Sequence, residues 1–184
     1  MATDIARFVT GESWLGWFVA ADVGSTLRWL LLGDDEDSVI AALLERSPGV
    51  TAHSRRQDGE RLLAQARRAL DPLGTDPLPM LDPQGTEFQR RVWAALRHIP
   101  AGEMRSYTEL AQAVGRPGSV RAVAGACAAN PIAVAIPCHR VCRRDGGLGG
   151  YRWGLWRKCC LLGREAVASS PLPRPDPAAA RLRP

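Results

Sequence analysis

Cysteine is absent from the first 126 residues of this sequence. All five cysteines lie in the last third of the chain, and they are Cys127, Cys138, Cys142, Cys159 and Cys160. An odd number of cysteines in such a distribution is not a disulfide framework, so we expect free thiols. Free thiols are typical of a reducing compartment, which predicts a cytoplasmic protein.

Long hydrophobic runs are also missing. No stretch approaches the roughly 20 apolar residues that a membrane-spanning helix needs, so we expect no membrane association. The first ten residues, MATDIARFVT, lack the basic segment and apolar core of a secretory signal. The sequence also contains no Gly-rich phosphate loop, which argues against a nucleotide cofactor. A length of 184 residues allows one large domain or two small ones.

Positive charge is scarce in the first half and abundant in the second. Residues 1–84 contain 8 Arg or Lys and 13 Asp or Glu, whereas residues 85–184 contain 16 and 6. The formal charges are therefore −5 and +10, which agree with the total of +5. A basic half is typical of a protein that binds a polyanion such as nucleic acid, although a basic surface without a partner explains the charge equally well.

The first 80 residues resemble a small α/β unit. Apolar, β-rich runs at 5–10, 14–22 and 27–33 are separated by turn residues and predict strands. Apolar residues at helical spacing predict helices at 34–47 and 59–70. The chain then becomes rich in proline, and we expect a linker between two domains at 81–85. Residues 167–184 are rich in Pro and Arg and predict a disordered tail.

Residues 86–166 are expected to form a second, mainly helical domain. Thr86 with Gln89 and Ser106 with Glu109 match capping boxes, each at the start of an apolar helical stripe. Gly115 suits the left-handed position that ends a helix. A short turn then leads into a further helix at 119–130. Two short helices joined by a Gly-containing turn predict a helix-turn-helix.

The second of these helices has an unusual exposed face. Helical spacing places Val120, Val123, Ala124 and Cys127 on a buried stripe, so Cys127 is expected to be a core thiol. The opposite face carries Arg121, Ala122 and Gly125. Such small residues suit close, sequence-tolerant contact with a nucleic-acid groove, with Arg121 free to enter the duplex. Tight packing against another helix is the alternative.

Cys138 and His139 stand side by side after an apolar run, 131–137, that we expect to be a strand. A thiol in such a buried position has a raised pKa and is inert unless a base lies nearby. Neighbouring residues of a strand point to opposite faces, so contact between the two requires a turn at 137–140 or an intervening water. A histidine that acts as a base also needs a group that orients it.

Glu165 is the best candidate for that group. Residues 155–165 have helical spacing in which Leu155, Cys159 and Leu162 form the predicted apolar face. Glu165 lies at the margin of that face, where it could reach a buried histidine, although a solvated glutamate at a helix end is the simpler interpretation. The same spacing predicts that Cys159 points inward and Cys160 outward.

A structural zinc site is a weaker alternative for the same residues. Cys138, His139, Cys142 and the Cys159–Cys160 pair supply enough soft ligands. Adjacent Cys-His and Cys-Cys pairs are poor chelators, however, and the sequence has no paired C-x2-C knuckle. We therefore expect no metal, and we expect no chemical role for Cys142.

The segment PCHRV at 137–141 is preceded by SVRAVAGACAANPIAVAI and followed by DGGLGGYRWGLWRKCCLLGRE. Together with GTEFQRRVWAALRHIPAGE and SYTELAQAVGRP, these motifs resemble the O6-alkylguanine-DNA alkyltransferases, in particular the bacterial methylated-DNA–protein-cysteine methyltransferases. The resemblance is close over residues 85–165 and weaker over 1–80. It implies an α/β fold with two domains: a ribonuclease-H-like domain at 1–80 and a helix-turn-helix, winged-helix-like domain at 86–166.

The resemblance also implies how DNA is bound. The helix-turn-helix contacts the minor groove of double-stranded DNA, and the damaged guanine is flipped into a pocket. Arg121 matches the arginine that fills the gap in the duplex, with Ala122 and Gly125 on the contact face. Tyr107 matches the tyrosine that promotes rotation of the nucleotide and donates to the flipped guanine. Asn130 matches the asparagine that ties the recognition helix to the active-site turn.

Further matches concern the reaction itself. The resemblance implies that the thiolate of Cys138 takes the alkyl group from O6 of guanine, and also from O4 of alkylthymine. His139 acts as the base through a water, and Glu165 holds His139. The remaining matches are positions that line the guanine pocket, namely Val141, Tyr151 and Arg152.

Single use and the absence of a cofactor also follow from the resemblance. The alkyl group comes from DNA, and the thioether has no route back to a thiol, so each monomer reacts once. Some members bind zinc in the N-terminal domain, but residues 1–126 contain no cysteine and we expect no such site. Two alternatives stay open: a module that binds alkylated DNA without transfer, and a sequence-specific regulator. The smooth face around Arg121 argues against the regulator, because it offers few groups that read bases.

Overall fold

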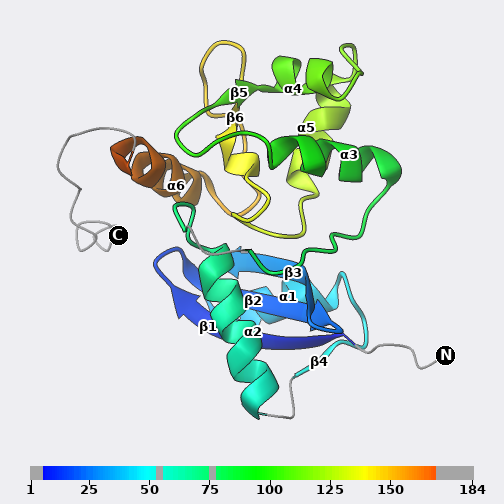
Figure 1. The fold of residues 1–184 in the computed structure, drawn as a ribbon, viewed down its shortest axis with the longest axis vertical. Coiled ribbons are helices and arrows are strands. Elements are labelled where there is room, and N and C mark those ends of the chain that lie inside the picture. The colour runs from blue at the N-terminus through cyan, green and yellow to red at the C-terminus, as the bar shows by residue number, and fades with distance from the viewer. Residues whose placement is uncertain (1–5, 53–55, 75–77, 169–184) are drawn as a thin grey trace.

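The computed structural model describes residues 6–52, 56–74 and 78–168 and has a mixed α/β fold (Figure 1). The expected tail lies outside the described residues except for 167 and 168, which end the last helix. In Figure 1 the N-terminal sheet and its helices occupy the lower half, and the helix-rich C-terminal part occupies the upper half. Among the described residues, none of the helices combines the length and apolar character needed to cross a membrane.

The predicted N-terminal strands and helices are confirmed. The strands are β1 (Arg7–Ser13), β2 (Gly16–Val23), β3 (Thr26–Gly33) and the short β4 (Thr51–Ala52), and the helices are α1 (Glu36–Leu44) and α2 (Arg56–Ala69). The strands form one sheet in the order β3-β2-β1-β4, with β1–β2 and β2–β3 antiparallel and β1–β4 parallel. Four consecutive residues of β2, from Phe18 to Ala21, are fully buried, so both faces of the sheet are covered.

The outer edge of β3 joins the two halves of the molecule. The backbone of Leu27 donates to Met80 O at 2.9 Å and accepts from Asp82 N at 3.0 Å, so part of the proline-rich segment extends the sheet. Farther along the same edge, Leu30 N donates to Pro131 O at 2.9 Å and Leu30 O accepts from Ala133 N at 2.8 Å. The edge of β3 therefore holds the segment that leads to Cys138.

The C-terminal part contains the expected helix-turn-helix. The two helices of this motif are α4 (Tyr107–Ala113) and α5 (Val120–Ala128), and α3 (Glu87–Leu96) precedes them. A small parallel pair of strands is formed by β5 (Arg105–Ser106) and β6 (Val141–Cys142). Both predicted capping boxes are present, on Thr86 and on Ser106. Gly115 has φ +69°, as expected for the residue that ends α4. Trp93 of α3 is buried and donates to Ala126 O of α5 at 2.8 Å, which locks these two helices together.

The prediction of a strand at 131–137 is wrong. Apart from the single bridge between Leu30 and Ile132, this segment consists of turns, and it ends in a 3-10 helix at Cys138–Arg140. Val134 has φ +64°, a left-handed conformation that is strained for a β-branched residue by about 1–3 kcal/mol. Apolar composition predicted burial correctly, but the segment bends back on itself, with Ile136 N donating to Ile132 O, and the Asn130 side chain bonds both Ile132 N and Ile136 O.

The predicted buried face of α6 (Leu155–Ala168) is also wrong. Leu155 is 49% exposed and Cys159 is exposed, while Cys160 is half-buried. Among residues 155–166 of this helix, the buried ones are instead Arg157, Lys158, Leu161 and Glu165. Two cations lie on the inner face because carbonyl groups from distant segments accept their hydrogen bonds, which a count of apolar residues does not detect.

Candidate active site

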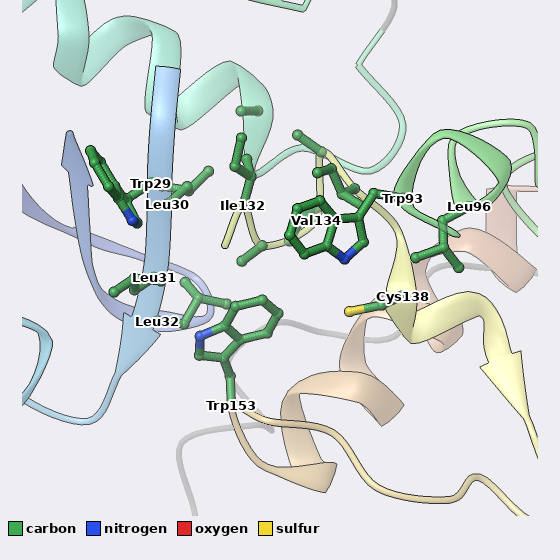
Figure 2. Packing of buried hydrophobic residues seen from close by; sticks show 14 of the residues in the cluster. Trp29, Leu30, Leu31, Leu32, Trp93, Leu96, Ile132, Val134, Cys138 and Trp153 are labelled. Atoms are coloured by element: carbon green, nitrogen blue, oxygen red, sulfur yellow. The ribbon is translucent and has the colours of Figure 1, made fainter. Parts of the chain in front are cut away.

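Cys138 begins the 3-10 turn and is only 6% exposed. Its sulfur points toward the side of the apolar cluster where Trp93 and Trp153 lie (Figure 2). Asn130 Nδ2 donates to this sulfur at 3.2 Å and to Ile136 O at 2.8 Å, while Asn130 Oδ1 accepts from Ile132 N at 2.9 Å. One buried amide thus holds both ends of the turn segment and the thiol, which links α5 to Cys138.

Burial is the main influence on the thiol. It raises the pKa of Cys138 to about 11, against the opposing effects of the Asn130 hydrogen bond and the Lys158 charge. The thiol is therefore protonated near neutral pH in this conformation. A reaction at Cys138 requires a group that accepts its proton.

His139 and Glu165 form a fully buried pair, with His139 Nε2 2.8 Å from Glu165 Oε1. Burial lowers the pKa of His139, which Glu165 only partly counteracts, so the imidazole is neutral. Burial by itself raises the pKa of Glu165, but hydrogen bonds from His139 and Arg140 bring it below its usual value. With an ionised carboxylate at Nε2, that nitrogen carries the proton, and Nδ1 is left as the acceptor.

The free nitrogen of His139 is available for chemistry. Nδ1 is buried and has no hydrogen-bond partner among the described residues. The 3-10 turn at 138–140 is the turn that contact between Cys138 and His139 requires. No hydrogen bond joins these two side chains within the described part of the chain, so proton transfer between them needs an intervening molecule such as water.

Arg140 and Lys158 also belong to this cluster, and our sequence analysis did not identify them. Arg140 donates to both oxygens of Glu165 at 2.8–3.2 Å and to Ile99 O at 2.6 Å. Lys158 is fully buried and donates to Val141 O at 2.6 Å and to Leu148 O. Lys158, Leu161 and Glu165 follow the helical spacing i, i+3 and i+7, which was the available signal for this face.

Aromatic residues continue the cluster beyond His139. Tyr151 meets His139 edge-on at 6.5 Å and Trp153 at 5.2 Å between ring centroids. The Tyr151 hydroxyl is buried and has no partner among the described residues, and burial raises its pKa well above the usual value. Burial also raises the pKa of Tyr107, which packs near Gly149. Both phenols are therefore neutral hydrogen-bond donors.

Three of the other predicted site residues lie on α5, Arg152 contacts its C-terminal end, and Val141 lies on β6. Arg121, Ala122 and Gly125 are on the exposed face of α5, as predicted, and Val123 and Cys127 are buried beneath them. Arg152 is exposed and donates to Ala128 O at 3.0 Å, so it caps the carbonyl end of α5. Val141 is buried, and its carbonyl already accepts from Lys158.

The residues considered for zinc are not gathered in one place. No group of three or more His, Cys, Asp or Glu side chains within the described ranges could hold a metal ion. His139 is paired with Glu165, Cys138 with Asn130, and Cys159 is exposed.

Comparison with known proteins places this site in a family. Residues 87–167 match the model of the 6-O-methylguanine DNA methyltransferase DNA-binding domain. The bifunctional transcriptional activator/DNA repair enzyme Ada of Escherichia coli is 43% identical over 160 residues, covering 87% of this chain and 45% of Ada. A methylated-DNA–protein-cysteine methyltransferase of Mycolicibacterium paratuberculosis is 56% identical over 85 residues, covering 46% of this chain and 52% of that protein. The chain thus spans about half the length of these curated relatives.

Solved structures match over a longer range. Two crystal structures from Mycobacterium tuberculosis, one of O6-methylguanine methyltransferase and one of OGT in complex with DNA, share 36% and 35% identity with this chain. Both have a TM-score of 0.70, and the matches cover 89% and 88% of this chain and 94% and 92% of theirs. The chain therefore belongs to the O6-methylguanine DNA methyltransferase family.

Proposed function

We propose that this protein repairs DNA directly, by transferring the alkyl group of O6-alkylguanine in double-stranded DNA to the sulfur of Cys138. The observation that carries the proposal is the buried thiol beside a buried, neutral histidine whose Nδ1 has no partner among the described residues. The relatives named as methylated-DNA–protein-cysteine methyltransferases support the same chemistry. O4-alkylthymine is a second proposed substrate, because it presents an alkyl group on the corresponding oxygen.

The reaction is proposed as a single displacement. His139 Nδ1 takes the thiol proton through a water, and Glu165 stabilises the resulting imidazolium. The thiolate attacks the alkyl carbon, a sulfur–carbon bond forms, and the carbon–oxygen bond breaks with its electron pair moving onto guanine. Tyr107, a neutral phenol, donates a hydrogen bond to the base as it becomes anionic. The base then takes up one proton from water to give guanine, and His139 releases the thiol proton to water, which balances the step. The product thioether leaves no thiol at position 138, so each molecule reacts once, and the reaction needs no cofactor because the alkyl group comes from DNA.

The exposed face of α5 is proposed to lie in the minor groove. Arg121 would fill the space left by the flipped nucleotide, while Ala122 and Gly125 allow close approach of the backbone. The flipped base would occupy a pocket lined by Tyr151, the Val141 carbonyl and Arg152. The OGT crystal structure was solved in complex with DNA, which supports a duplex as the partner.

We also propose the finer assignments of the fold. The strand order β3-β2-β1-β4, with β1 parallel to β4, supports a ribonuclease-H-like domain at 1–80. The helix-turn-helix with the β5–β6 pair supports a winged-helix-like domain at 86–166, after a linker at 81–85. A protein with free thiols and a DNA substrate is expected in the cytoplasm, and it is expected to act as a monomer.

Mass spectrometry of the intact protein tests the function. After incubation with a duplex that contains one O6-methylguanine, we expect one added methyl group on the Cys138 peptide and an unmodified guanine in the DNA. Bound DNA without a change in protein mass would contradict transfer and favour the alternative, a module that only binds alkylated DNA. A binding titration tests the other alternative. A protein that binds damaged and undamaged duplexes of one sequence with equal affinity, and binds duplexes of other sequences much more weakly, would be a sequence-specific regulator.

Substitutions of Gly125 should affect the stability of the fold and the affinity for DNA in opposite directions. A Cβ added at Gly125 meets no atom within 4 Å, so the fold itself does not require glycine there. Gly125→Ala should raise the free energy of unfolding by about 0.5–1 kcal/mol. Gly125→Leu should weaken duplex binding at least tenfold in a fluorescence anisotropy titration, because the side chain would meet the groove. Gly163 of α6 is also open and is the matched control, since Gly163→Leu should leave binding unchanged.

The transfer rate should depend on pH through His139. Because burial lowers the pKa of His139, the neutral base persists below the ordinary histidine value of about 6.5. The single-turnover rate constant should therefore be constant above about pH 7 and fall up to tenfold per unit once pH drops below the pKa of His139. A rate that rises steadily between pH 7 and 9 would instead indicate direct titration of the thiol without a base.

A further inference from the structure

We propose that Arg157 is a positioning residue for alkyl transfer. It fastens to the N-terminal sheet the first turn of α6 and the turn before it, residues 151–154, which we call the pocket wall because it carries Tyr151 and Arg152 of the proposed guanine pocket. The inference rests on the proposed function. Arg157 is 3% exposed, and its guanidinium lies where three segments meet: the β1–β2 turn, the end of β3 and the turn that precedes α6.

Three acceptors come from the N-terminal part of the chain. Arg157 Nε donates to Leu15 O at 2.7 Å, and Nη2 donates to Gly33 O at 2.6 Å and to Asp34 Oδ1 at 2.7 Å. Two of these acceptors are backbone carbonyls: Leu15 O lies in the β1–β2 turn and Gly33 O at the end of β3, so the sheet and its first turn fix their positions. The Asp34 side chain is 82% exposed, so the carbonyls carry most of the interaction.

A fourth acceptor belongs to the pocket wall. Arg157 Nη1 donates to Trp153 O at 2.7 Å, and the guanidinium lies 4.3 Å from the centroid of the Trp156 ring. The four hydrogen bonds use all three nitrogens of the planar guanidinium group. A lysine has a single ammonium group and cannot reach all four acceptors, so Arg157→Lys is not a conservative change here.

Two glycines with positive φ adjoin this contact, and one of them makes room for it. Gly16 has φ +93°, and an added Cβ would lie 2.9 Å from Arg157 Nη2 and 2.9 Å from Gly33 O. Gly154 has φ +96°, and an added Cβ would lie 3.7 Å from Nη1, an ordinary contact distance, so at this position only the backbone conformation favours glycine. Backbone on both sides of the guanidinium is therefore in a conformation that favours glycine.

The residues that Arg157 holds lead directly to the reacting groups. Trp153 contacts Tyr151, and Tyr151 contacts His139. Figure 2 shows the Trp153 indole in the cluster between Leu32 of β3 and Cys138. The next residue, Lys158, donates to Val141 O, and Glu165 lies on the same helix. A loss of Arg157 should therefore displace the pocket wall while leaving the recognition helix α5 in place.

Single-turnover kinetics on the full chain test this role. The probe is a duplex with one O6-methylguanine, and the temperature lies well below the Tm of every variant. For Arg157→Met we expect the limiting transfer rate constant to fall at least tenfold, with the Kd for the duplex within twofold of wild type. Arg157→Lys should recover only part of the rate. Arg164→Met is the matched control, because Arg164 is a half-exposed arginine of the same helix that lies over Trp14, and it should change neither quantity.

A second measurement does not depend on transfer. We expect iodoacetamide to label Cys138 of the DNA-free Arg157→Met protein several times faster than wild type, because the Trp153 segment that helps to bury the thiol is released. A folded Arg157→Met with wild-type rate and labelling would overturn the proposal, as would an equal loss of rate in Arg164→Met. If Arg157→Met does not fold, wild-type behaviour of Arg157→Lys overturns it. A wild-type protein that does not transfer, together with faster labelling of the variant, would reject the proposed function and retain the placement by Arg157.

Discussion

Replacing Cys138 by alanine should abolish alkyl transfer completely while the Kd for a duplex containing O6-methylguanine stays within about twofold. Sulfur is the atom that forms the new bond, and no other thiol is expected to replace it as the acceptor. The face of α5 that we propose to contact DNA is separate from the thiol, and Asn130 keeps its two backbone hydrogen bonds when the sulfur is removed. Intact mass measures transfer, and anisotropy measures binding.

Cys142 and Cys160 supply the controls for this prediction. Both are half-buried thiols that take no part in the proposed displacement. Cys142→Ser and Cys160→Ser should each gain one methyl group at the wild-type rate. Methylation of Cys138→Ala at either position would show that we have assigned the wrong acceptor.

Replacing Glu165 by leucine should have the largest effect on stability, a loss of about 3–5 kcal/mol in the free energy of unfolding. The carboxylate is fully buried and accepts hydrogen bonds from Arg140 and His139, and a leucine in its place would leave the Arg140 charge buried without its counterion. Urea denaturation measures the loss. Transfer should also slow severely, because His139 loses the group that orients it.

A double variant distinguishes an unpaired charge from simple loss of packing. Glu165→Leu combined with Arg140→Met removes both charges, and it should recover a large part of the stability lost in Glu165→Leu. Glu103→Leu is the surface control, because its pair with Arg105 is exposed and contributes about 0–1 kcal/mol. No recovery in the double variant would contradict the view that the buried charge dominates.

The same carboxylate predicts how stability depends on acid. The pKa of Glu165 is lower in the folded protein than the value of about 4.3 expected in the unfolded chain. Its contribution to stability is therefore fully present above that unfolded value and is lost as pH falls through the folded pKa. The difference in stability between wild type and Glu165→Leu should shrink below about pH 4.

The sequence by itself determined the local structure of this protein. Strands β1 to β3 and both capping boxes were predicted, because β-rich runs between turn residues and hydrogen bonds between residues three apart involve only neighbouring residues. The family resemblance pointed to Cys138, His139 and Glu165 as one group, and the structure brings His139 and Glu165 into contact. The smooth exposed face of α5 also followed from helical spacing alone.

Only the tertiary structure decided which face of α6 is buried and how the chain bends before Cys138. Lys158 and Arg157 are buried because carbonyls from remote segments, such as Leu148, Leu15 and Gly33, satisfy their donors. Residues 131–137 form turns whose backbone groups bond to the Asn130 side chain, to one another and to Leu30 of β3 instead of to a continuous strand ladder. In both places the distribution of apolar residues predicted the wrong structure, because a buried polar group is stable only where other parts of the fold supply its hydrogen bonds.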